Sequence, residues 1–170
     1  MPAETTVIVM GVSGAGKSAV GSALAVRLGR PFVDADDLHP QTNVAKMAQG
    51  HPLDDDDRWP WLDAVGAAAI AAPGTVIACS ALRRSYRERL LVAAPDALFV
   101  ELDVPRAELE RRVRVRSHEF MPSSLLDSQL ATLESLGADE PGFAVAVDPA
   151  ESLDDLIARI EAELGRRPTA

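Results

Sequence analysis

One short segment, at 11–18, restricts the fold of this chain more than any other feature. It reads Gly-Val-Ser-Gly-Ala-Gly-Lys-Ser and fits the pattern G-x-x-x-x-G-K-[ST] at every fixed position. An apolar, β-branched stretch at 5–10 precedes it, and apolar residues with helical spacing follow at 18–28. A strand, a glycine-rich turn and a helix in this order form a loop whose backbone N–H groups converge on an anion. The sequence therefore predicts a nucleotide-phosphate site at this loop.

The residue types in this loop match the chemistry of phosphate binding. Glycines adopt backbone angles that other residues avoid and leave the amide groups accessible to an anion. Lys17 is expected to reach the β- and γ-phosphates, and the Ser18 hydroxyl is expected to ligate Mg²⁺. The residues predicted to bind ATP here are Gly11, Val12, Ser13, Gly14, Ala15, Gly16, Lys17 and Ser18.

Beyond this loop, apolar stretches of strand length alternate with stretches of helical periodicity. Continuously apolar strands joined by helices are typical of a parallel sheet that is covered on both faces. No internal repeat or linker divides the chain, so we predict one α/β domain over residues 1–170. Strands are expected at 5–10, 32–33, 75–79, 97–102 and 143–147, and helices at 18–28, 43–49, 58–71, 85–94, 105–115, 125–136 and 152–164.

Charge and composition exclude several classes of protein. The net charge of −9 disfavours a nonspecific binder of nucleic acid, which usually carries a basic surface. No apolar stretch approaches the ~20 residues that a membrane span needs, and the short apolar run near the N-terminus lacks the basic flank of a signal peptide. The single cysteine, Cys79, allows neither an internal disulfide nor a cysteine-rich zinc site. A cytoplasmic protein is expected.

Two carboxylates follow the expected strand at 32–33. Asp34 and Asp36 would lie at the sheet edge where α/β proteins bind ligands, and on an extended segment both side chains would point the same way. Phosphoryl transfer uses such groups, one to hold Mg²⁺ through water and one to orient or deprotonate the attacking hydroxyl. The alternative is a cluster that caps the next helix, an interpretation we favour for Asp37. Ser80, which follows the strand at 75–79, should lie at the same edge.

An acidic run precedes an unusually placed arginine. Asp57, the last of four consecutive acids, is expected to cap a helix that begins at Arg58. Because the N-terminus of a helix is electrostatically positive, an arginine there does not stabilise the helix. Arg58 is therefore a candidate for binding an anion, and Trp61 is expected to pack in the core.

With these segments in order, the chain resembles the gluconate kinases, a family of P-loop small-molecule kinases close to the shikimate and nucleoside monophosphate kinases. The stretches most specific to that family are Leu38-His39-Pro40 with Lys46-Met47, and Asp57-Arg58 with Pro60-Trp61-Leu62. Further matches extend from Met10 to about Glu140, at Asn43, Gly50, Pro52-Leu53, Cys79-Ser80-Ala81-Leu82, Tyr86-Arg87, Arg116, Leu126, Gln129 and Thr132-Leu133-Glu134.

The resemblance implies a fold and a reaction. The fold would be the P-loop NTPase fold of the nucleoside-monophosphate and shikimate kinase type, with a parallel five-stranded sheet, flanking helices and a mobile lid at about 116–124. The reaction would transfer the γ-phosphoryl group of ATP to the 6-hydroxyl of D-gluconate. Asp36 would serve the attacking hydroxyl, and Asp34 would support Mg²⁺ through water. The resemblance also suggests a homodimer, although the sequence carries no interface signal of its own.

The remaining site residues are mostly basic. Gluconate is an anionic polyol, and a guanidinium fork suits its carboxylate, so Arg58 is the first choice for that group. Arginines near the lid would neutralise charge on the transferred phosphoryl group, although the dipole of the preceding helix favours arginines there in any case. The residues expected to contact substrate are Asp36, His39, Lys46, Arg58, Arg83 and Arg87. Arg112 and Arg116 are expected to contact ATP, and the expected catalytic residues are Lys17, Asp36 and Arg116. For His39, capping before Pro40 is the alternative.

Other functions remain to be distinguished. A GTPase is excluded, because the only asparagine is Asn43 and valine follows it, so the guanine-reading Asn-Lys-x-Asp segment is missing. A related kinase acting on another small hydroxy acid such as shikimate is the alternative, followed by a nucleotide-binding module without catalysis. The chain also departs from the family at His118-Glu119, where the family reads Gly-His, and this puts a lid contact by the family histidine in doubt.

Overall fold

A single parallel sheet organises the part of the chain that the computed structural model describes, residues 4–116 and 123–166. Within these residues the sheet has five strands in the order β2-β3-β1-β4-β5. The central strand β1 is in register with both neighbours, so that Ile8 lies opposite Ile77 and Phe99. This confirms the predicted parallel five-stranded sheet. The strands are β1 (Val7–Met10), β2 (Phe32–Asp34), β3 (Val76–Ala78), β4 (Leu98–Asp103) and β5 (Gly142–Ala146).

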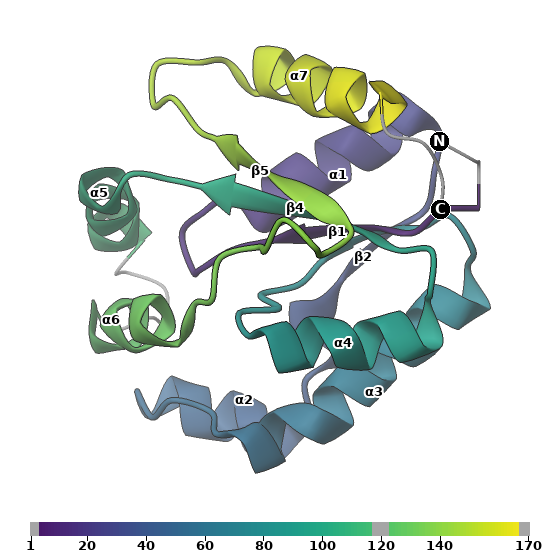
Figure 1. Cartoon of the computed structure of the whole chain (residues 1–170). Helices are drawn as coiled ribbons and strands as arrows, with labels where there is room; N and C mark the ends of the chain where they lie inside the picture. The colour runs from purple at the N-terminus through teal and green to yellow at the C-terminus, as the bar shows by residue number, and fades with distance from the viewer. Residues whose placement is uncertain (1–3, 117–122, 167–170) are drawn as a thin grey trace.

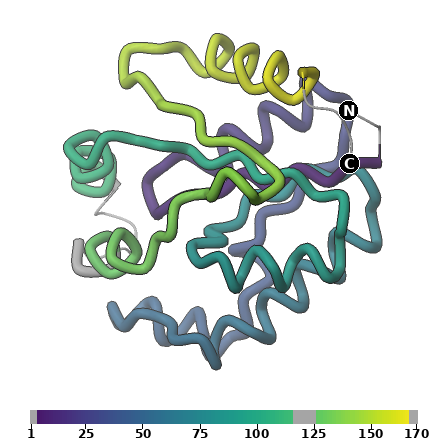
Figure 2. Tube along the Cα trace, viewed as in Figure 1, coloured from purple at the N-terminus to yellow at the C-terminus, as the bar shows by residue number. Residues whose placement is uncertain are grey.

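Helices cover both faces of this sheet, as Figure 1 shows. On one face lie α1 (Lys17–Leu28) and α7 (Leu153–Arg166), and on the other lie α3 (Asp55–Ala71) and α4 (Arg84–Ala93). The remaining helices are the 3₁₀ helix η1 (Ala35–Leu38), α2 (Gln41–Ala48), α5 (Arg106–Arg116) and α6 (Ser123–Thr132). The strand arrows in Figure 1 point toward the end of the molecule where α5 and α6 lie, and the Cα trace in Figure 2 also shows these two helices side by side.

The central strand contributes to two cores, one on each face. Val7 and Val9 pack among residues of α1 and α7, whereas Ile8 and Met10 pack among residues of α3 and α4, including Trp61. Successive side chains of a strand point to opposite faces, so a strand buried on both sides must be apolar at every position. This burial explains the continuous apolar runs in the sequence. Burial on both faces also holds the end of β1 in place, and so positions the start of the glycine-rich loop that follows.

Two local predictions were wrong. Asp54, not Asp57, caps α3: the Asp54 carboxylate accepts a hydrogen bond from the Asp57 backbone N–H, and the Asp57 carboxylate accepts one from the Asp54 backbone N–H, each at 3.0 Å. This reciprocal capping box satisfies two backbone donors instead of one. The segment after β2 is also not extended, because Ala35–Leu38 forms a 3₁₀ helix. In the described part of the chain, no helix is both long and apolar enough to cross a membrane.

Candidate active site

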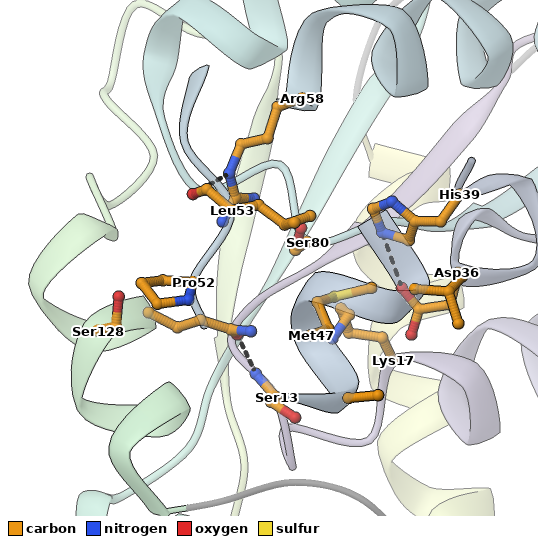
Figure 3. Close-up of a pocket in the computed structure, with 13 residues that line it drawn as sticks. Ser13, Lys17, Asp36, His39, Met47, Pro52, Leu53, Arg58, Ser80 and Ser128 are labelled. Carbon is orange, nitrogen blue, oxygen red and sulfur yellow. Dashed lines mark hydrogen bonds and ion pairs between the residues drawn. The ribbon is translucent and has the colours of Figure 1, made fainter. Parts of the chain in front are cut away.

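A pocket of about 470 Å³ lies beyond the carboxyl end of the sheet, and Figure 3 draws the residues that line it. The loop after β1, the 3₁₀ helix η1, the helices α2, α3 and α6, and Ser80 just after β3 all contribute to its wall. Segments far apart in the sequence therefore meet here, at the edge where α/β proteins bind ligands. Its polar lining residues are Ser13, Lys17, Asp36, His39, Arg58, Ser80, Ser128 and Gln129, and its apolar ones are Val44, Met47, Ala48, Pro52 and Leu53.

The glycine-rich loop has the backbone geometry that an anion cradle requires. Gly14 and Gly16 have φ angles of 81° and 96°, in the left-handed region that side chains disfavour. Gly16 is also the N-cap of α1, so the first amides of this helix and the positive end of its dipole lie at the loop. Lys17 lines the pocket, and its Nζ donates to the Val12 carbonyl at 3.2 Å. Ser18 is exposed in the first helical turn.

The site prediction missed two polar residues of the pocket lining, Ser128 and Gln129, and its apolar residues. Gln129, on α6, accepts a hydrogen bond at 2.6 Å from the Ser13 backbone N–H of the loop. It is one of the residues on which the family resemblance rested, and that was its only signal in the sequence. The contact joins α6 to the phosphate loop across more than a hundred residues, which no local pattern could indicate. Ser80, in contrast, lines the pocket as expected.

The two aspartates after β2 have different surroundings. Asp36 lines the pocket, and its side chain is 70% exposed. Asp34 caps η1, because its Oδ1 accepts the Asp36 backbone N–H at 3.0 Å. The prediction that both side chains point the same way from an extended segment was therefore wrong, since the chain turns into a 3₁₀ helix after Asp34. One Asp34 oxygen serves the cap, and Asp36 is the carboxylate that faces the pocket.

Arg58 reaches the pocket from the first turn of α3. Only 7% of the residue is exposed, and its Nε donates to the Leu53 carbonyl at 3.4 Å. Its guanidinium lies 5.4 Å from the ring centroid of Tyr86, within the range of a cation–π contact. The capping acids stabilise the helix start, whereas Arg58 turns inward. The electrostatic argument from the sequence thus identified a cation that the structure aims at the pocket.

Two other basic residues predicted to bind substrate lie outside the lining of this pocket. The Lys46 Nζ pairs with Asp54 at 3.0 Å and also with Asp57, so it holds the start of α3. Arg83 donates to both oxygens of Asp55 at 3.1 Å. In this structure both residues stabilise the helix that carries Arg58.

Arg87 was predicted to bind substrate, but the structure gives it a different role. Its side chain is 1% exposed, and it forms a two-pronged ion pair with Glu140, with Nε–Oε1 at 2.5 Å and Nη2–Oε2 at 2.8 Å. Its Nη1 donates to the carbonyls of Ala81 and Glu134 at 3.1 and 2.9 Å. These contacts occupy all three guanidinium nitrogens inside the protein and hold the pKa of Glu140 below its usual range. Arg87 therefore joins α4 to the segment before β5 and does not contact the pocket.

Replacing Arg87 by alanine should destabilise the fold strongly. The free energy of unfolding is expected to fall by about 3–5 kcal/mol, because the buried Glu140 carboxylate would lose its cation. Urea denaturation measures this change. Arg89→Ala is the matched control on the same helix: Arg89 pairs with Asp63, but both side chains are about half exposed, so stability should hardly change. Equal effects of the two substitutions would contradict the structural role of Arg87.

The region predicted as a lid is described only in part. Arg112 donates from Nη1 to the Gly14 and Ala15 carbonyls at 3.3 and 3.2 Å, and from Nε to Glu108 at 2.6 Å. It therefore touches the phosphate loop, and its contact with ATP stays a prediction. Arg116 ends α5, but its side chain lies outside the described part of the chain. Residues 117–122 of the predicted lid, including His118 and Glu119, also lie outside it.

Cys79 belongs to the core beneath this site. It is fully buried, and burial raises the pKa of its thiol to about 12. A thiol that stays protonated at neutral pH is a poor nucleophile. The structure agrees with the prediction that Cys79 is a small core residue.

Along most of its length, this chain is similar to known gluconokinases. A curated gluconokinase of Gluconobacter oxydans (strain 621H) is 48% identical over 162 residues, which cover 92% of this chain and 91% of that protein. The crystal structure of a gluconokinase from Sinorhizobium meliloti 1021 matches with a TM-score of 0.87 at 43% identity, covering 98% of this chain and 94% of that one. Residues 7–136 match a family model described as an AAA domain.

A solved structure with much lower sequence identity shares the fold of this chain. A shikimate kinase from Acinetobacter baumannii covers 94% of this chain and 92% of its own, with a TM-score of 0.62 but only 18% identity. At that identity the likeness is one of fold.

Proposed function

The chain belongs to the gluconokinase family, and from this premise we propose how its pocket transfers the γ-phosphoryl group of ATP to the 6-hydroxyl of D-gluconate. The shikimate alternative is not favoured, because that family shares only the fold. The observation that carries the proposal is that Lys17, Asp36 and Arg58 line one pocket. A phosphate-binding cation, a carboxylate and a second cation for an anionic substrate are the three groups that this reaction needs.

ATP would lie along the glycine-rich loop. Its phosphates would meet the amides at the start of α1, with Lys17 at the β- and γ-phosphates. A second cavity, of about 350 Å³, lies on the other side of the loop and supports a place for the nucleoside. It is lined by Gly14 and Gly16 and by Arg112, Asp148 and Ser152, among others. Arg112 would then lie beside the bound nucleotide, as predicted, with Arg116 one helical turn further along α5.

The donor set fits a Mg²⁺ ion that ATP itself brings. The described part of the chain holds no group of three or more His, Cys, Asp or Glu side chains suited to a metal. Mg²⁺ is commonly held by one or two protein oxygens, phosphate oxygens and water, so a dedicated cage is not required. Ser18 would supply a direct hydroxyl oxygen and Asp34 a contact through water. The ion would neutralise charge on the phosphates.

Gluconate would occupy the cavity between α2, α3 and α6. Its carboxylate would pair with Arg58, whose guanidinium presents a planar fork to a planar anion. Lys46 and Arg83 would act indirectly. They pair with Asp57 and Asp55 of α3, and so hold the helix that positions Arg58. Gln129 and Ser80 offer hydrogen-bonding groups for the hydroxyls along the chain of the sugar acid. His39 would lie near the end of gluconate that carries the 6-hydroxyl.

In the chemical step, Asp36 would act as the base for the proton of the 6-hydroxyl. As the 6-hydroxyl oxygen bonds to the γ-phosphorus, the bond from that phosphorus to the β,γ-bridging oxygen breaks, and ADP leaves with the electron pair. The Asp36 carboxylate accepts the hydroxyl proton. Lys17 and the loop amides stabilise the negative charge on the phosphates as it moves toward the leaving oxygen.

The activity can be measured directly. ADP release is followed with gluconate, shikimate, gluconolactone and nucleoside monophosphates as acceptors, each against the rate with water alone. Turnover with gluconate and formation of 6-phosphogluconate are expected. The proposal fails if gluconate gives only the background rate while another acceptor is phosphorylated.

Arg58→Ala should weaken gluconate binding selectively. The KM for gluconate is expected to rise roughly 10- to 100-fold, the equivalent of about 1.5–3 kcal/mol for a hydrogen-bonded charge, while the KM for ATP changes little. Arg83→Ala is the matched comparison, because Arg83 lies over the same Tyr86 ring at 5.9 Å but does not line the pocket. A smaller rise is expected there. If KM rose equally for both substrates in Arg58→Ala, a role in binding the carboxylate would be excluded.

A further inference from the structure

The His39 ring is held on several sides by groups that determine its orientation. Its side chain is 5% exposed and stacks on Trp61, with ring centroids 4.3 Å apart and planes inclined by 10°. The Trp61 indole N–H donates to the Ala35 carbonyl at 2.7 Å. That carbonyl belongs to η1, the same short helix that carries Asp36. Trp61 therefore holds the His39 ring and the backbone of Asp36 in one unit.

Asn43 defines which ring nitrogen of His39 carries the proton. Its side-chain Nδ2 donates to the Asp57 carbonyl at 2.8 Å and lies 3.4 Å from His39 Nδ1. A carbonyl oxygen only accepts, so the amide must place its NH₂ group here, and the second N–H of that group faces His39. Asn43 is 3% exposed, which leaves its amide little freedom to turn. His39 Nδ1 is thus the acceptor, and the proton of the neutral ring lies on Nε2.

The protonated nitrogen faces Asp36. His39 Nε2 lies 4.0 Å from Asp36 Oδ1, the contact drawn as a dashed line in Figure 3. Burial lowers the pKa of His39, and the nearby Asp36 and Arg58 act on it in opposite directions. A neutral ring with its one N–H aimed at a carboxylate is a hydrogen-bond donor, not a counter-ion. The Asp36 side chain is exposed enough to rotate into hydrogen-bonding distance.

We propose that His39 is a positioning residue for Asp36: its Nε2–H binds Asp36 Oδ1 in the reacting complex, and Asn43 fixes the tautomer that makes this possible. Oδ2 of Asp36 is then directed at the 6-hydroxyl. No proton leaves His39; the hydroxyl proton passes to Asp36 Oδ2 and departs to water after the product leaves. The proposal rests on the function proposed above, in which Asp36 accepts that proton.

Three substitutions of His39 separate positioning from packing. His39→Gln places an amide N–H near the position of Nε2 and should retain most of kcat. His39→Phe keeps the stacking on Trp61 but offers no donor, and His39→Asn reaches only the Nδ1 position. Both should lower kcat by about 10²-fold, the cost of a misplaced reacting group, with a small change in KM for gluconate. Native kcat in His39→Phe, or a change in KM alone, would overturn the proposal.

A double-mutant cycle distinguishes this proposal from the one on which it rests. His39→Phe is combined with Asp36→Asn, and kcat is measured for all four proteins. If His39 acts through Asp36, His39→Phe should lower kcat only slightly in a protein that already carries Asp36→Asn. Additive losses would show that His39 acts independently and would overturn the positioning role. An unchanged kcat in Asp36→Asn alone would instead reject Asp36 as the base.

The tautomer has its own measurement, which does not depend on activity. Long-range ¹H–¹⁵N spectra of the folded protein assign the ring nitrogens of the three histidines, and His39→Gln identifies the signals of His39. We expect a neutral ring with the proton on Nε2 and an unprotonated Nδ1. A ring protonated on Nδ1 would overturn the proposal, because Nε2 would then present a lone pair to the Asp36 carboxylate.

Discussion

Lys17→Ala should abolish phosphorylation of gluconate, with kcat/KM reduced by roughly 10³-fold or more, the scale for loss of a key electrostatic contact to the reacting group. In the structure the Lys17 ammonium lies in the pocket wall and donates to the Val12 carbonyl of its own loop. When ATP binds, the same ammonium would meet the β- and γ-phosphates, where charge moves during transfer. Steady-state assays of ADP release measure the loss.

Two variants test whether charge is the cause. Lys17→Met keeps the length of the side chain without its charge and should lose as much activity as Lys17→Ala. Arg27→Ala removes a cation from the same helix, but one that pairs with Glu161 on the surface, and it should remain active. Thermal unfolding would confirm that all three proteins are folded. Substantial turnover by a folded Lys17→Met would show that the loop binds phosphate without this charge.

The second large effect is expected at Asp36. Asp36→Asn should lower kcat by about 10²- to 10⁴-fold, the usual contribution of a general base, while the fold and the KM for ATP are preserved. Asparagine has nearly the same shape but cannot accept the hydroxyl proton. The side chain is mostly exposed, so its replacement should not disturb the core. Rapid-quench measurement of a single turnover reports the chemical step directly.

Asp37→Asn is the matched control for this substitution. Asp37 is the next residue of the same 3₁₀ helix, and it is exposed and absent from the pocket lining. The same change of charge at Asp37 should leave kcat nearly native. If both variants lost activity equally, the effect would come from the local electrostatic field. In that case Asp36 would have no special role as base.

The parts of the site that follow from local patterns could be predicted. The glycine-rich loop lies where the apolar run of β1 ends, and both its residue types and its flanking elements are visible in sequence order. Arg58 could also be identified, because a cation in the first turn of a helix is unfavourable unless something else requires it. Trp61 and Cys79 were expected in the core, where the structure places them.

Errors arose where a pattern allowed two local geometries. After β2 the residues fit an extended segment or a helical turn, and the buried packing of Ala35 in the core next to α3 selects the turn. In the acidic run, any of four aspartates could cap α3. The reciprocal bonds of Asp54 and Asp57 decide the choice, and the sequence shows only that both residues can form them.

The sequence by itself determined the class of fold and the phosphate loop, because strand burial, helix periodicity and the glycine requirement act within a few neighbouring residues. It could not separate all of the arginines that it predicted to bind substrate. Arg58 and Arg87 were both among them, yet Arg58 lines the pocket and Arg87 is buried against Glu140, 53 positions away in the chain. The same holds for Asn43, His39 and Asp57, whose alignment depends on how α2 meets α3. Only the tertiary structure decided these roles, because a long charged or polar side chain takes its partner from whatever the folded chain brings within its reach.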